Sequence, residues 1–368
     1  MGGVLWSLEA ATEAKHRLYK RYFDAWWPIL LQPSAGTGRS WSKVTFLDAF
    51  AGPGRYEGGE QGSPVFTLDR LLTHGAVDRM NLSRERVQLV FIEKRRDRYE
   101  YLLGQLHDRF GPLEHLPVRV EVHRGEAGVD SERILTELGA WGQPILGVFD
   151  SWGSVNVPLE LMRRIAHNRA SEVIATFGPN WFSRREDLNS DILDAVFGGR
   201  AFWAPAAEVE ESDKKWRAWL EIYREALHRA GFNFRLQFKV VPHTGQPLYL
   251  VFGTGHEKGV EVMKEAMWSV DKSDGMSFKD PRVRNAVALG QGSLFDDGEV
   301  IDPELLTLVQ QRLGQGAVSL EQLGQWLLLE TSQWRARDAK KAVQDLHGDG
   351  RVIIPAGRLT KASVVSLR

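Results

Sequence analysis

The sequence predicts an α/β protein: a doubly wound, mostly parallel sheet followed by a smaller C-terminal unit. Three observations lead to this prediction. Five short apolar segments typical of buried strands alternate with helical segments between residues 44 and 177. A glycine-bearing loop directly follows the first of these strands. Beyond residue 300, three helical patterns precede a hairpin pattern, which indicates a separate compact unit.

The composition limits the classes of protein to which this chain can belong. Its 368 residues suffice for a large domain and a smaller one, and its 43% hydrophobic content excludes a disordered chain. The formal net charge of -1 gives no overall attraction to nucleic acid, so any basic surface must be local. The absence of cysteine excludes disulfides, thiolate metal sites and a cysteine nucleophile, and we expect no metal. The sequence shows neither a membrane-length apolar run nor a leader pattern, which predicts a soluble, cytoplasmic protein.

The first strand and its loop are the centre of the predicted site. Residues 44–47 are apolar and β-branched, as in a buried parallel strand, and Asp48 stands where the strand should end. Gly52 and Gly54 allow a sharp turn and a close approach to a ligand. Ligands of open α/β sheets bind beyond the carboxyl ends of the strands, where this loop lies. The alternative is an ordinary tight turn between a strand and a helix.

The later strands each bring an acidic residue to the same edge. Glu93 closes the second strand, Glu126 follows the third and Asp150 follows the fourth. Because parallel strands end at one edge of the sheet, these acids and Asp48 should share one rim. The predicted strands after the first are residues 87–92, 118–122, 144–149 and 172–177, and the helices between them are residues 63–74, 95–110, 131–138 and 159–167.

The segments on either side of this sheet are also regular. Residues 9–31 should form a helix that carries Lys15, His16 and a broad aromatic face, with a kink or an end at Pro28. The simplest role for this helix is packing on the main domain. Residues 216–230 and 259–270 should be helical, and residues 234–242 and 248–253 should be paired strands.

The C-terminal part predicts a winged-helix domain. We place domain boundaries at residues 1–274, a polar, glycine-bearing linker at 275–299, and the last domain at 300–368. Helices at 303–313, 320–329 and 336–347 precede strands at 351–354 and 362–367. Cations on the third helix and the wing could contact the phosphates of a duplex, and a protein-binding wing is the alternative. The predicted nucleic-acid-binding residues are Arg335, Arg337, Lys340, Lys341, Arg358 and Lys361.

These motifs resemble one known family, the three-Cys-motif partner proteins (TcmP), over nearly the whole chain. The matching pieces are Lys15-His16 with Trp26, the block at residues 48–56, Gly62-Ser63-Pro64, residues 91–94, and the winged-helix tail. The block at 48–56 is also similar to ribosomal RNA adenine-N6 methyltransferases with a Lys-His helix before it. The resemblance implies a class I, Rossmann-like methyltransferase fold that uses S-adenosylmethionine (SAM). It also implies a partner, the radical-SAM-like three-Cys-motif protein, and a role in phage or mobile-element defence or nucleic-acid processing.

The resemblance, together with the rim, gives the predicted site residues their roles. Glu93 should hold the ribose hydroxyls of SAM, and Glu126 should face its adenine amino group. Asp150 should accept a hydrogen bond from a target base amine, and Trp152 should stack on that base. The predicted cofactor residues are Asp48, Ala51, Gly52, Gly54, Glu93 and Glu126, and the predicted catalytic residues are Asp150, Trp152, Lys15 and His16.

One departure from the family bears on catalysis. The chain has Asp150-Ser151-Trp152-Gly153 where the family has Asp-Pro-Phe-Gly, so it lacks the proline that shapes the amine-binding backbone. Two hypotheses therefore stand: a nucleic-acid methyltransferase, and a catalytically silent methyltransferase fold that acts as a winged-helix adaptor. An NAD-dependent oxidoreductase is disfavoured because the Gly-x-Gly-x-x-Gly fingerprint is missing. Asp150 could also simply cap the helix that begins after Val157.

Overall fold

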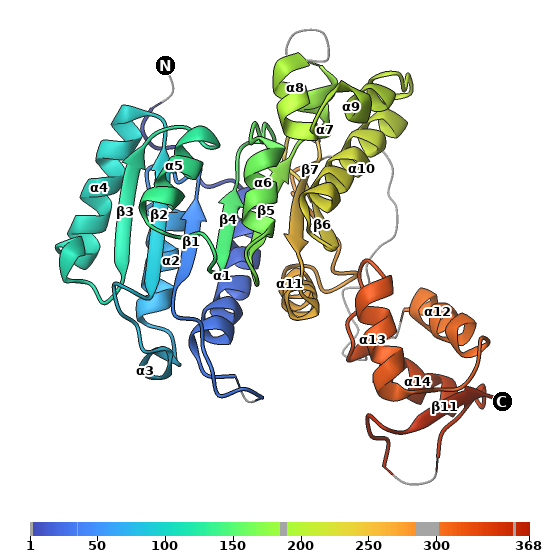
Figure 1. Ribbon diagram of the computed structural model, residues 1–368. Coiled ribbons are helices and arrows are strands. Elements are labelled where there is room, and N and C mark those ends of the chain that lie inside the picture. Colours follow the sequence, from blue (N-terminus) through green and yellow to red (C-terminus); the bar gives the residue numbers. More distant parts are fainter. Residues whose placement is uncertain (1–2, 35, 185–189, 284–301, 356–357) are drawn as a thin grey trace. The chain divides into compact units, whose positions relative to one another are not determined.

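The computed structural model describes residues 3–34, 36–184, 190–283, 302–355 and 358–368 (Figure 1). The chain forms two compact units, Met1–Val283 and Arg284–Arg368. Most of the stretch predicted as a linker, from residue 284 onwards, lies outside the described residues. Its first part does not: Ser277–Lys279 forms the edge strand β8 of the first unit.

The first unit is built on one eight-stranded sheet in the order β3-β2-β1-β4-β5-β7-β6-β8. Strands β1 to β5 are parallel to one another, whereas β7 is antiparallel to both β5 and β6. The predicted doubly wound, mostly parallel sheet is therefore confirmed. The strands are β1 Val44–Asp48, β2 Val87–Glu93, β3 Arg119–Arg124, β4 Ile145–Phe149, β5 Glu172–Phe177, β6 Phe234–Val241, β7 Leu248–Thr254 and β8 Ser277–Lys279.

The strand order defines where a ligand should bind. From β1 the chain continues outward to β2 and β3, then crosses back to β4 on the other side of β1. The crevice between the carboxyl ends of β1 and β4 is thus the topological switch point, the usual ligand site of such sheets. Asp48 ends β1 and Asp150 directly follows β4, so both acids flank that crevice.

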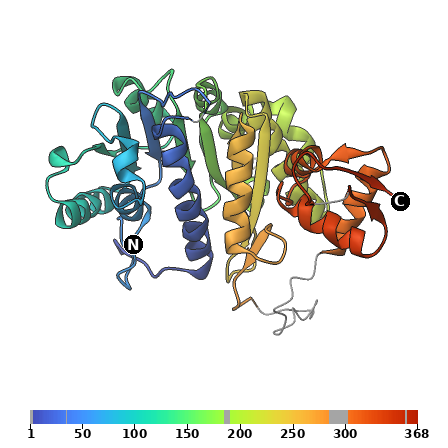
Figure 2. The ribbon, with the colours of Figure 1, turned by 90° about the horizontal axis from the view of Figure 1, so that it is seen from below.

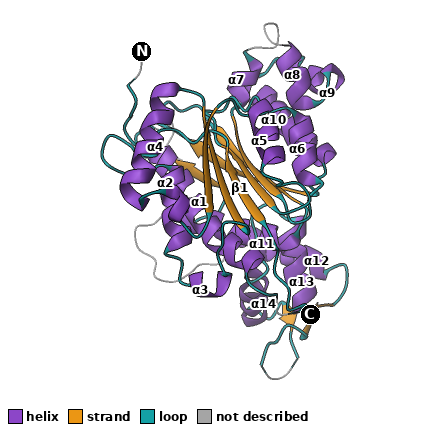
Figure 3. Ribbon diagram, turned by 60° about the vertical axis from the view of Figure 1, so that its left-hand side comes forward, coloured by secondary structure: helices purple, strands orange, loops and turns teal. Residues whose placement is uncertain are grey.

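Helices cover both faces of the sheet (Figure 3). Helices α1 and α11 lie side by side on one face, together with α2, as seen from below in Figure 2. Helices α5, α6 and α10 cover the other face. The helices of this unit are α1 Ala10–Leu31, α2 Ser63–Leu72, α3 Val77–Met80, α4 Arg96–Phe110, the 3-10 turn Leu113–His115, α5 Val129–Glu137, α6 Leu159–Ala166, α7 Pro179–Ser183, α8 Ser190–Phe197, α9 Arg200–Ala207, α10 Ser212–Ala230 and α11 Glu257–Val270.

Aromatic packing fixes α1 on the sheet. Phe23 lies edge-on to Phe46 of β1, with ring centroids 5.1 Å apart, and Trp27 packs beside the same ring. Pro28 lies inside the helix and does not end it. Since burying one large apolar side chain stabilises a fold by about 1.5–3 kcal/mol, this aromatic face explains why α1 docks. The packing role expected for this helix is confirmed. The docked helix also holds Lys15 and His16 over the ends of the strands.

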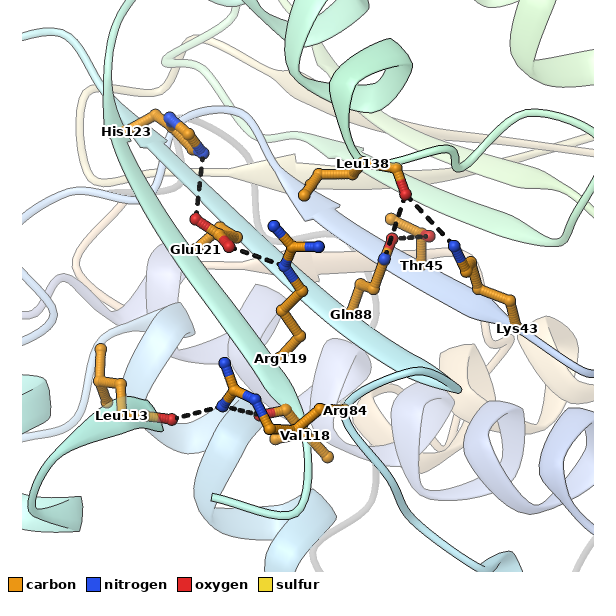
Figure 4. Close-up of polar contacts among 10 residues, drawn as sticks. All are labelled: Lys43, Thr45, Arg84, Gln88, Leu113, Val118, Arg119, Glu121, His123 and Leu138. Atoms are coloured by element: carbon orange, nitrogen blue, oxygen red, sulfur yellow. Dashed lines mark hydrogen bonds and ion pairs between the residues drawn. The ribbon is translucent and has the colours of Figure 1, made fainter. Parts of the chain in front are cut away.

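Buried polar side chains connect the sheet at the opposite end (Figure 4). Thr45 Oγ1 donates to Gln88 Oε1 at 3.2 Å, which links β1 with β2. Gln88 Nε2 and Lys43 Nζ both donate to the carbonyl of Leu138, at 3.2 and 3.3 Å. The side chains of Thr45 and Gln88 thus have partners, which offsets the cost of burying them between apolar layers.

Sequence patterns missed one part of the first unit. The short helices α7, α8 and α9 follow β5 and pack against α10. Phe177, Phe182 and Phe197 form an aromatic cluster there with Trp219 and Tyr223 of α10. These helices are too short to show a clear period, so only tertiary packing identifies them.

The C-terminal unit combines three helices with a small antiparallel sheet. Strand β11 pairs with both β10 and β9. Ser319 caps α13 through a reciprocal capping box with Gln322, as its position predicts. Among the described helices of the whole chain, none is long and apolar enough to cross a membrane. The elements are α12 Pro303–Leu313, β9 Val318–Ser319, α13 Leu320–Glu330, α14 Asp338–Gly348, β10 Val352–Ile353 and β11 Val364–Leu367.

Candidate functional site

A cavity of about 420 Å³ opens at the switch point. The segments that follow β1, β2, β3 and β4 line it, together with α1 and residues before α1. Its volume lies within the roughly 300–1,000 Å³ of typical small-molecule sites. Nine of the ten predicted cofactor and catalytic residues line this one cavity: Lys15, His16, Ala51, Gly52, Gly54, Glu93, Glu126, Asp150 and Trp152.

The glycine loop needs glycine for two different reasons. Gly52 and Gly54 have φ values of +66° and +76°, which disfavour any other residue. A Cβ atom on Gly54 would also lie 2.7 Å from Leu102 of α4, and one on Gly62 would lie 2.8 Å from the backbone of Gly54. The Gly62 amide donates to the Gly54 carbonyl at 2.8 Å, which closes the loop against the start of α2. The sequence block 52–62 therefore encodes a tight cradle.

Asp48 lies beneath the cavity and is not among its lining residues. Its Oδ2 accepts from Ser63 Oγ at 2.6 Å, and its Oδ1 accepts from the Phe50 amide at 3.1 Å. Burial raises the pKa of Asp48 to about 7, against the lowering effect of these two hydrogen bonds. The geometry gives Asp48 a positioning role, because it ties the end of β1 to the glycine loop and to α2.

The two glutamates predicted to bind cofactor differ in exposure. Glu93 is buried, and its Oε1 accepts from the Arg95 amide at 2.7 Å, which fixes the carboxylate at the end of β2. The Glu126 side chain is 65% exposed and pairs with Lys94 at 2.7 Å. A carboxylate has about four acceptor positions, so both can still accept further donors. Glu93 is the more firmly oriented of the two.

Asp150 is the centre of a buried polar network. Lys15 Nζ lies 2.6 Å from Asp150 Oδ1, and Tyr19 OH donates to Oδ2 at 2.9 Å. Thr176, in β5, also donates to Oδ1. Burial raises the pKa of Asp150, but the charge of Lys15 and these hydrogen bonds outweigh it and hold the pKa below its ordinary value. The alternative in which Asp150 caps a helix has no support, since α6 has no side-chain cap.

His16 and Trp152, the other two predicted catalytic residues, differ in exposure. Burial lowers the pKa of His16 to about 3, with the nearby Lys15 charge acting in the same direction, so the ring is neutral. It packs against Phe66 and lies 3.4 Å from the hydroxyl of Tyr56. Trp152, by contrast, is 58% exposed, and Lys15 Nζ lies 5.6 Å from its ring centroid. A neutral, packed histidine suits a structural role better than proton transfer.

Two side chains of the site had no functional signal in the sequence: Trp6, which lines the cavity, and Tyr19, which contacts Asp150 without lining it. Trp6 precedes α1 and closes one side of the cavity, with its ring 4.3 Å from the guanidinium of Arg98. The Trp6 carbonyl accepts from the Glu57 amide at 3.1 Å, which holds the segment against the glycine loop. Trp6 lies outside any periodic segment, so only the long-range contact reveals it. Tyr19 was expected only as part of the aromatic face, and its hydroxyl adds a polar contact to Asp150.

The predicted nucleic-acid-binding cations of the C-terminal unit are not equivalent. Arg335 precedes α14 and pairs with Asp338 at 2.8 Å, with both side chains largely buried. Its guanidinium therefore stabilises the start of the helix. The Lys361 ammonium lies 4.0 Å from Glu321, and its side chain remains 86% exposed. The exposed members of the predicted set are Arg337, Lys340, Lys341, Arg358 and Lys361.

One group of side chains has the composition of a metal site. Glu9, His243 and Asp280 bring one ligand atom each within 4.8 Å of the others. Arg282 pairs with both carboxylates, and His243 Nδ1 lies 3.2 Å from Glu9. The arginine already supplies the positive charge, so ion pairing explains this group.

Comparison with known proteins gives only distant structural likenesses. No protein-family model and no curated protein matches the chain. Trm1 from Pyrococcus horikoshii, solved with S-adenosyl-L-methionine, matches at 10% identity over 99% of this chain and 95% of its own, with a TM-score of 0.37. TYW2 from P. horikoshii, in complex with MeSAdo, matches at 12% identity over 67% of this chain and 64% of its own, with a TM-score of 0.31. Precorrin-6y C5,15-methyltransferase from Geobacter metallireducens matches at 10% identity over 69% of this chain and 98% of its own, with a TM-score of 0.30.

These likenesses carry no conclusion about what this chain binds, because every TM-score is below 0.5 and the chain spans less than two thirds of the length of TYW2. The chain's own topology is more informative. A large, mostly parallel mixed sheet with flanking helices, in which β7 pairs antiparallel with β5, fits a Rossmann-like methyltransferase fold. No family match bears on the resemblance to three-Cys-motif partner proteins, which stays a prediction.

Proposed function

We propose that the protein is a SAM-dependent methyltransferase that acts on nucleic acid, with an exocyclic base amine as the target. One observation carries the proposal: the cavity at the switch point joins the glycine cradle, the buried Glu93 and the Asp150 network in a single ligand-sized space. The strand order supports a methyltransferase, and the sequence resemblance supplies SAM.

The chemistry of the cavity fits SAM. Glu93 can accept hydrogen bonds from two ribose hydroxyls. The start of α2 lies at the cavity, and a helix N-terminus favours a carboxylate such as that of SAM. The aromatic rings of Trp6 and Trp152 suit the positive sulfonium, because a ring face attracts a cation. When bound, SAM would supply the activated methyl group.

Asp150 is proposed to orient the target amine. Oδ1 already accepts from Lys15 and Thr176, whereas Oδ2 accepts only from Tyr19 among the described residues. Since each carboxylate oxygen accepts about two hydrogen bonds, Oδ2 keeps one position for an amine. Holding the amine with its lone pair toward the methyl group would supply much of the rate acceleration.

The same network favours the second candidate, a catalytically silent adaptor. Three donors already satisfy most of Asp150, so the carboxylate also serves to dock α1 on the sheet. In this reading the fold would bind a partner or nucleic acid without transferring a methyl group. The radical-SAM-like three-Cys-motif protein, and a role in phage or mobile-element defence or nucleic-acid processing, remain proposals from the sequence resemblance alone.

The C-terminal unit is proposed to be a winged-helix domain that binds a duplex. Its three helices, followed by paired strands, have the winged-helix order, and the stretch between β10 and β11 would be the wing. Exposed Lys340 and Lys341 on α14 and Arg358 on the wing would contact phosphates, which position a protein on a duplex.

Two measurements test the proposal. Calorimetry with SAM should show binding to the wild-type protein. A radiolabel assay on mixed DNA and RNA, with and without the three-Cys-motif partner, should then show methyl transfer that Asp150→Asn loses while it retains SAM binding. SAM binding without transfer to any nucleic acid would instead favour the adaptor.

A further inference from the structure

A second cavity of about 350 Å³ lies beside the first, at the ends of β4 and β5. The loop after β4, the helix α7 and the turn before β7 line it. The arrangement combines two indole rings, two side-chain amides, one cation and an apolar floor. These are Trp152, Trp181, Asn180, Gln246, Arg184 and Leu248.

Trp152 belongs to the walls of both cavities. It is the one tryptophan among the exposed large hydrophobic residues of the described chain. On the side of the first cavity, Lys15 Nζ lies 5.6 Å from its ring centroid. A flat ligand in the second cavity would therefore lie next to the proposed methyl-donor site.

Two glycines hold the walls of the second cavity together. The Gly178 amide donates to the Gly153 carbonyl at 3.0 Å, so the loop after β4 lies directly against the start of α7. A Cβ atom on Gly153 would lie 3.0 Å from Gly178 and 2.8 Å from Leu248. Gly153 also has a φ of +92°. This close backbone contact brings Trp152 and Trp181 to one cavity, although 29 residues separate them in the sequence.

The polar groups of the second cavity suit the edge of a nucleobase. Asn180 Nδ2 donates to Gln246 Oε1, which leaves Gln246 Nε2 as a donor and the side-chain Oδ1 of Asn180 as an acceptor for a ligand. Side-chain amides of this kind pair with an adjacent amine and ring nitrogen, as on adenine. Arg184 is the only charged residue among the described lining residues, and it suits a phosphate.

We propose that the second cavity binds the extruded target base, stacked on Trp152 and Trp181 and read by the Asn180–Gln246 amide pair. This inference rests on the proposed function: an enzyme that modifies a base must take that base out of the stack, so the second cavity has this role only if the protein modifies nucleic acid. When Asn180 Oδ1 accepts from the exocyclic amine and Gln246 Nε2 donates to the ring nitrogen beside it, the pair fits adenine or cytosine, because uracil and thymine present a carbonyl and an N–H at these positions.

The test is a binding titration that needs no methyl transfer. The probe is a short single-stranded oligonucleotide, in RNA and DNA versions, that carries one fluorescent 2-aminopurine. Stacking on the indole rings should quench its fluorescence. Trp152→Ala and Trp181→Ala should each weaken binding by about tenfold, the loss expected for one base–aromatic contact. Trp152→Phe should keep most of the affinity because it retains a ring.

Two further variants test base selection and guard against misfolding. Gln246 is exposed in a turn, so Gln246→Ala should fold normally. It should reduce the preference for an adenine-containing over a uracil-containing competitor strand by about tenfold. Thr244→Ala, in the same turn but outside the cavity lining, is the matched control and should bind like the wild type.

The outcomes separate this inference from the proposed function. Normal SAM binding in calorimetry, together with quenching that the tryptophan and Gln246 variants leave unchanged, would overturn the base site alone. SAM binding with methyl transfer to a protein and no affinity for either strand would also overturn it. Quenching that depends on both tryptophans in a protein that binds no SAM would support the base site and refute the methyltransferase.

Discussion

Single side chains around the switch point depend on one another for their orientation. Lys15, with 6% of its side chain exposed, and Asp150, with 15%, form an ion pair that joins α1 to the end of β4. Removing one partner of a buried pair costs about 3–5 kcal/mol, because the other charge is left without compensation. Substitutions here therefore test stability as well as function. Asp150→Asn is preferred to Asp150→Ala because both remove the charge, but asparagine keeps a side-chain oxygen that can accept from Lys15 or Tyr19.

The two candidate cofactor glutamates should contribute unequally. Glu93→Ala removes a buried, oriented carboxylate, and losing a charged hydrogen bond costs about 1.5–3 kcal/mol. SAM affinity measured by calorimetry should therefore fall by about tenfold or more. Glu126→Ala should have a smaller effect, since that side chain is exposed and paired with Lys94. Glu137→Ala, on the exposed surface of α5, is the control. Unchanged affinity in the Glu93 variant would remove Glu93 from the cofactor site.

Asp48 should make stability depend on pH. Its folded-state pKa of about 7 lies above the ordinary value of 3.8, so the folded protein binds a proton that the unfolded chain releases between these values. The stability contributed by this group is full below about pH 4 and is lost as the pH rises toward 7.

Asp48→Asn should remove this loss. Urea unfolding should show the variant gaining stability relative to the wild type as the pH rises from about 4 to 7, by at most about 1.4 kcal/mol for each unit of pKa shift. Asp108→Asn, on the exposed surface of α4, controls for the loss of one negative charge. Parallel pH profiles for the wild type and Asp48→Asn would contradict the raised pKa.

At the scale of elements, the contact between the loops after β4 and β5 decides the shape of the site. Gly153→Ala should destabilise the protein for two reasons. A left-handed backbone costs about 1–2 kcal/mol in any residue with a Cβ atom, and here that atom would also meet the Gly178 backbone at 3.0 Å. Gly142→Ala is the matched control, because its φ is +82° but nothing lies within 4 Å of the added atom.

Denaturant unfolding of both glycine variants measures the difference. Gly142→Ala should lose about 1–2 kcal/mol from its backbone alone, and Gly153→Ala should lose more. Equal losses would mean that the two loops can move apart without cost. In that case the second cavity would not have fixed walls.

At the scale of the whole molecule, the proposed chemistry and the proposed duplex binding lie in different units. If the C-terminal cations contact phosphates, log K for duplex DNA should fall with log salt by about 0.9 for each contact. Lys340→Ala in the full chain should reduce that slope by about 0.9. Arg312→Ala, on α12 and outside the predicted set, should leave the slope unchanged.

Arg335→Ala separates a phosphate contact from a structural one. Its pairing with Asp338 predicts a loss of stability in the C-terminal unit with little change in the salt slope. Salt-independent binding by the wild-type protein would favour the protein-binding alternative for this unit.

The sequence by itself determined most elements of the sheet and the edge of the sheet at which the candidate site lies. Apolar runs such as residues 44–47 can only be buried, and a glycine block after such a strand can only serve as a close turn, so both are readable locally. The acidic residues at the strand ends are readable in the same way, because each stands at or just after the end of such an apolar run. Boundaries differ from the predicted ones by only a few residues for the long strands and helices.

Only the tertiary structure decided how the site residues are used. The partners of Asp150 lie 135, 131 and 26 positions away, at Lys15, Tyr19 and Thr176, and no local pattern links them. Trp6 and Trp181 reach the cavities through contacts between segments that show no period of their own. Such contacts depend on how α1 and α7 dock on the sheet. Docking is set by the fit of many side chains at once, which a linear sequence pattern does not express.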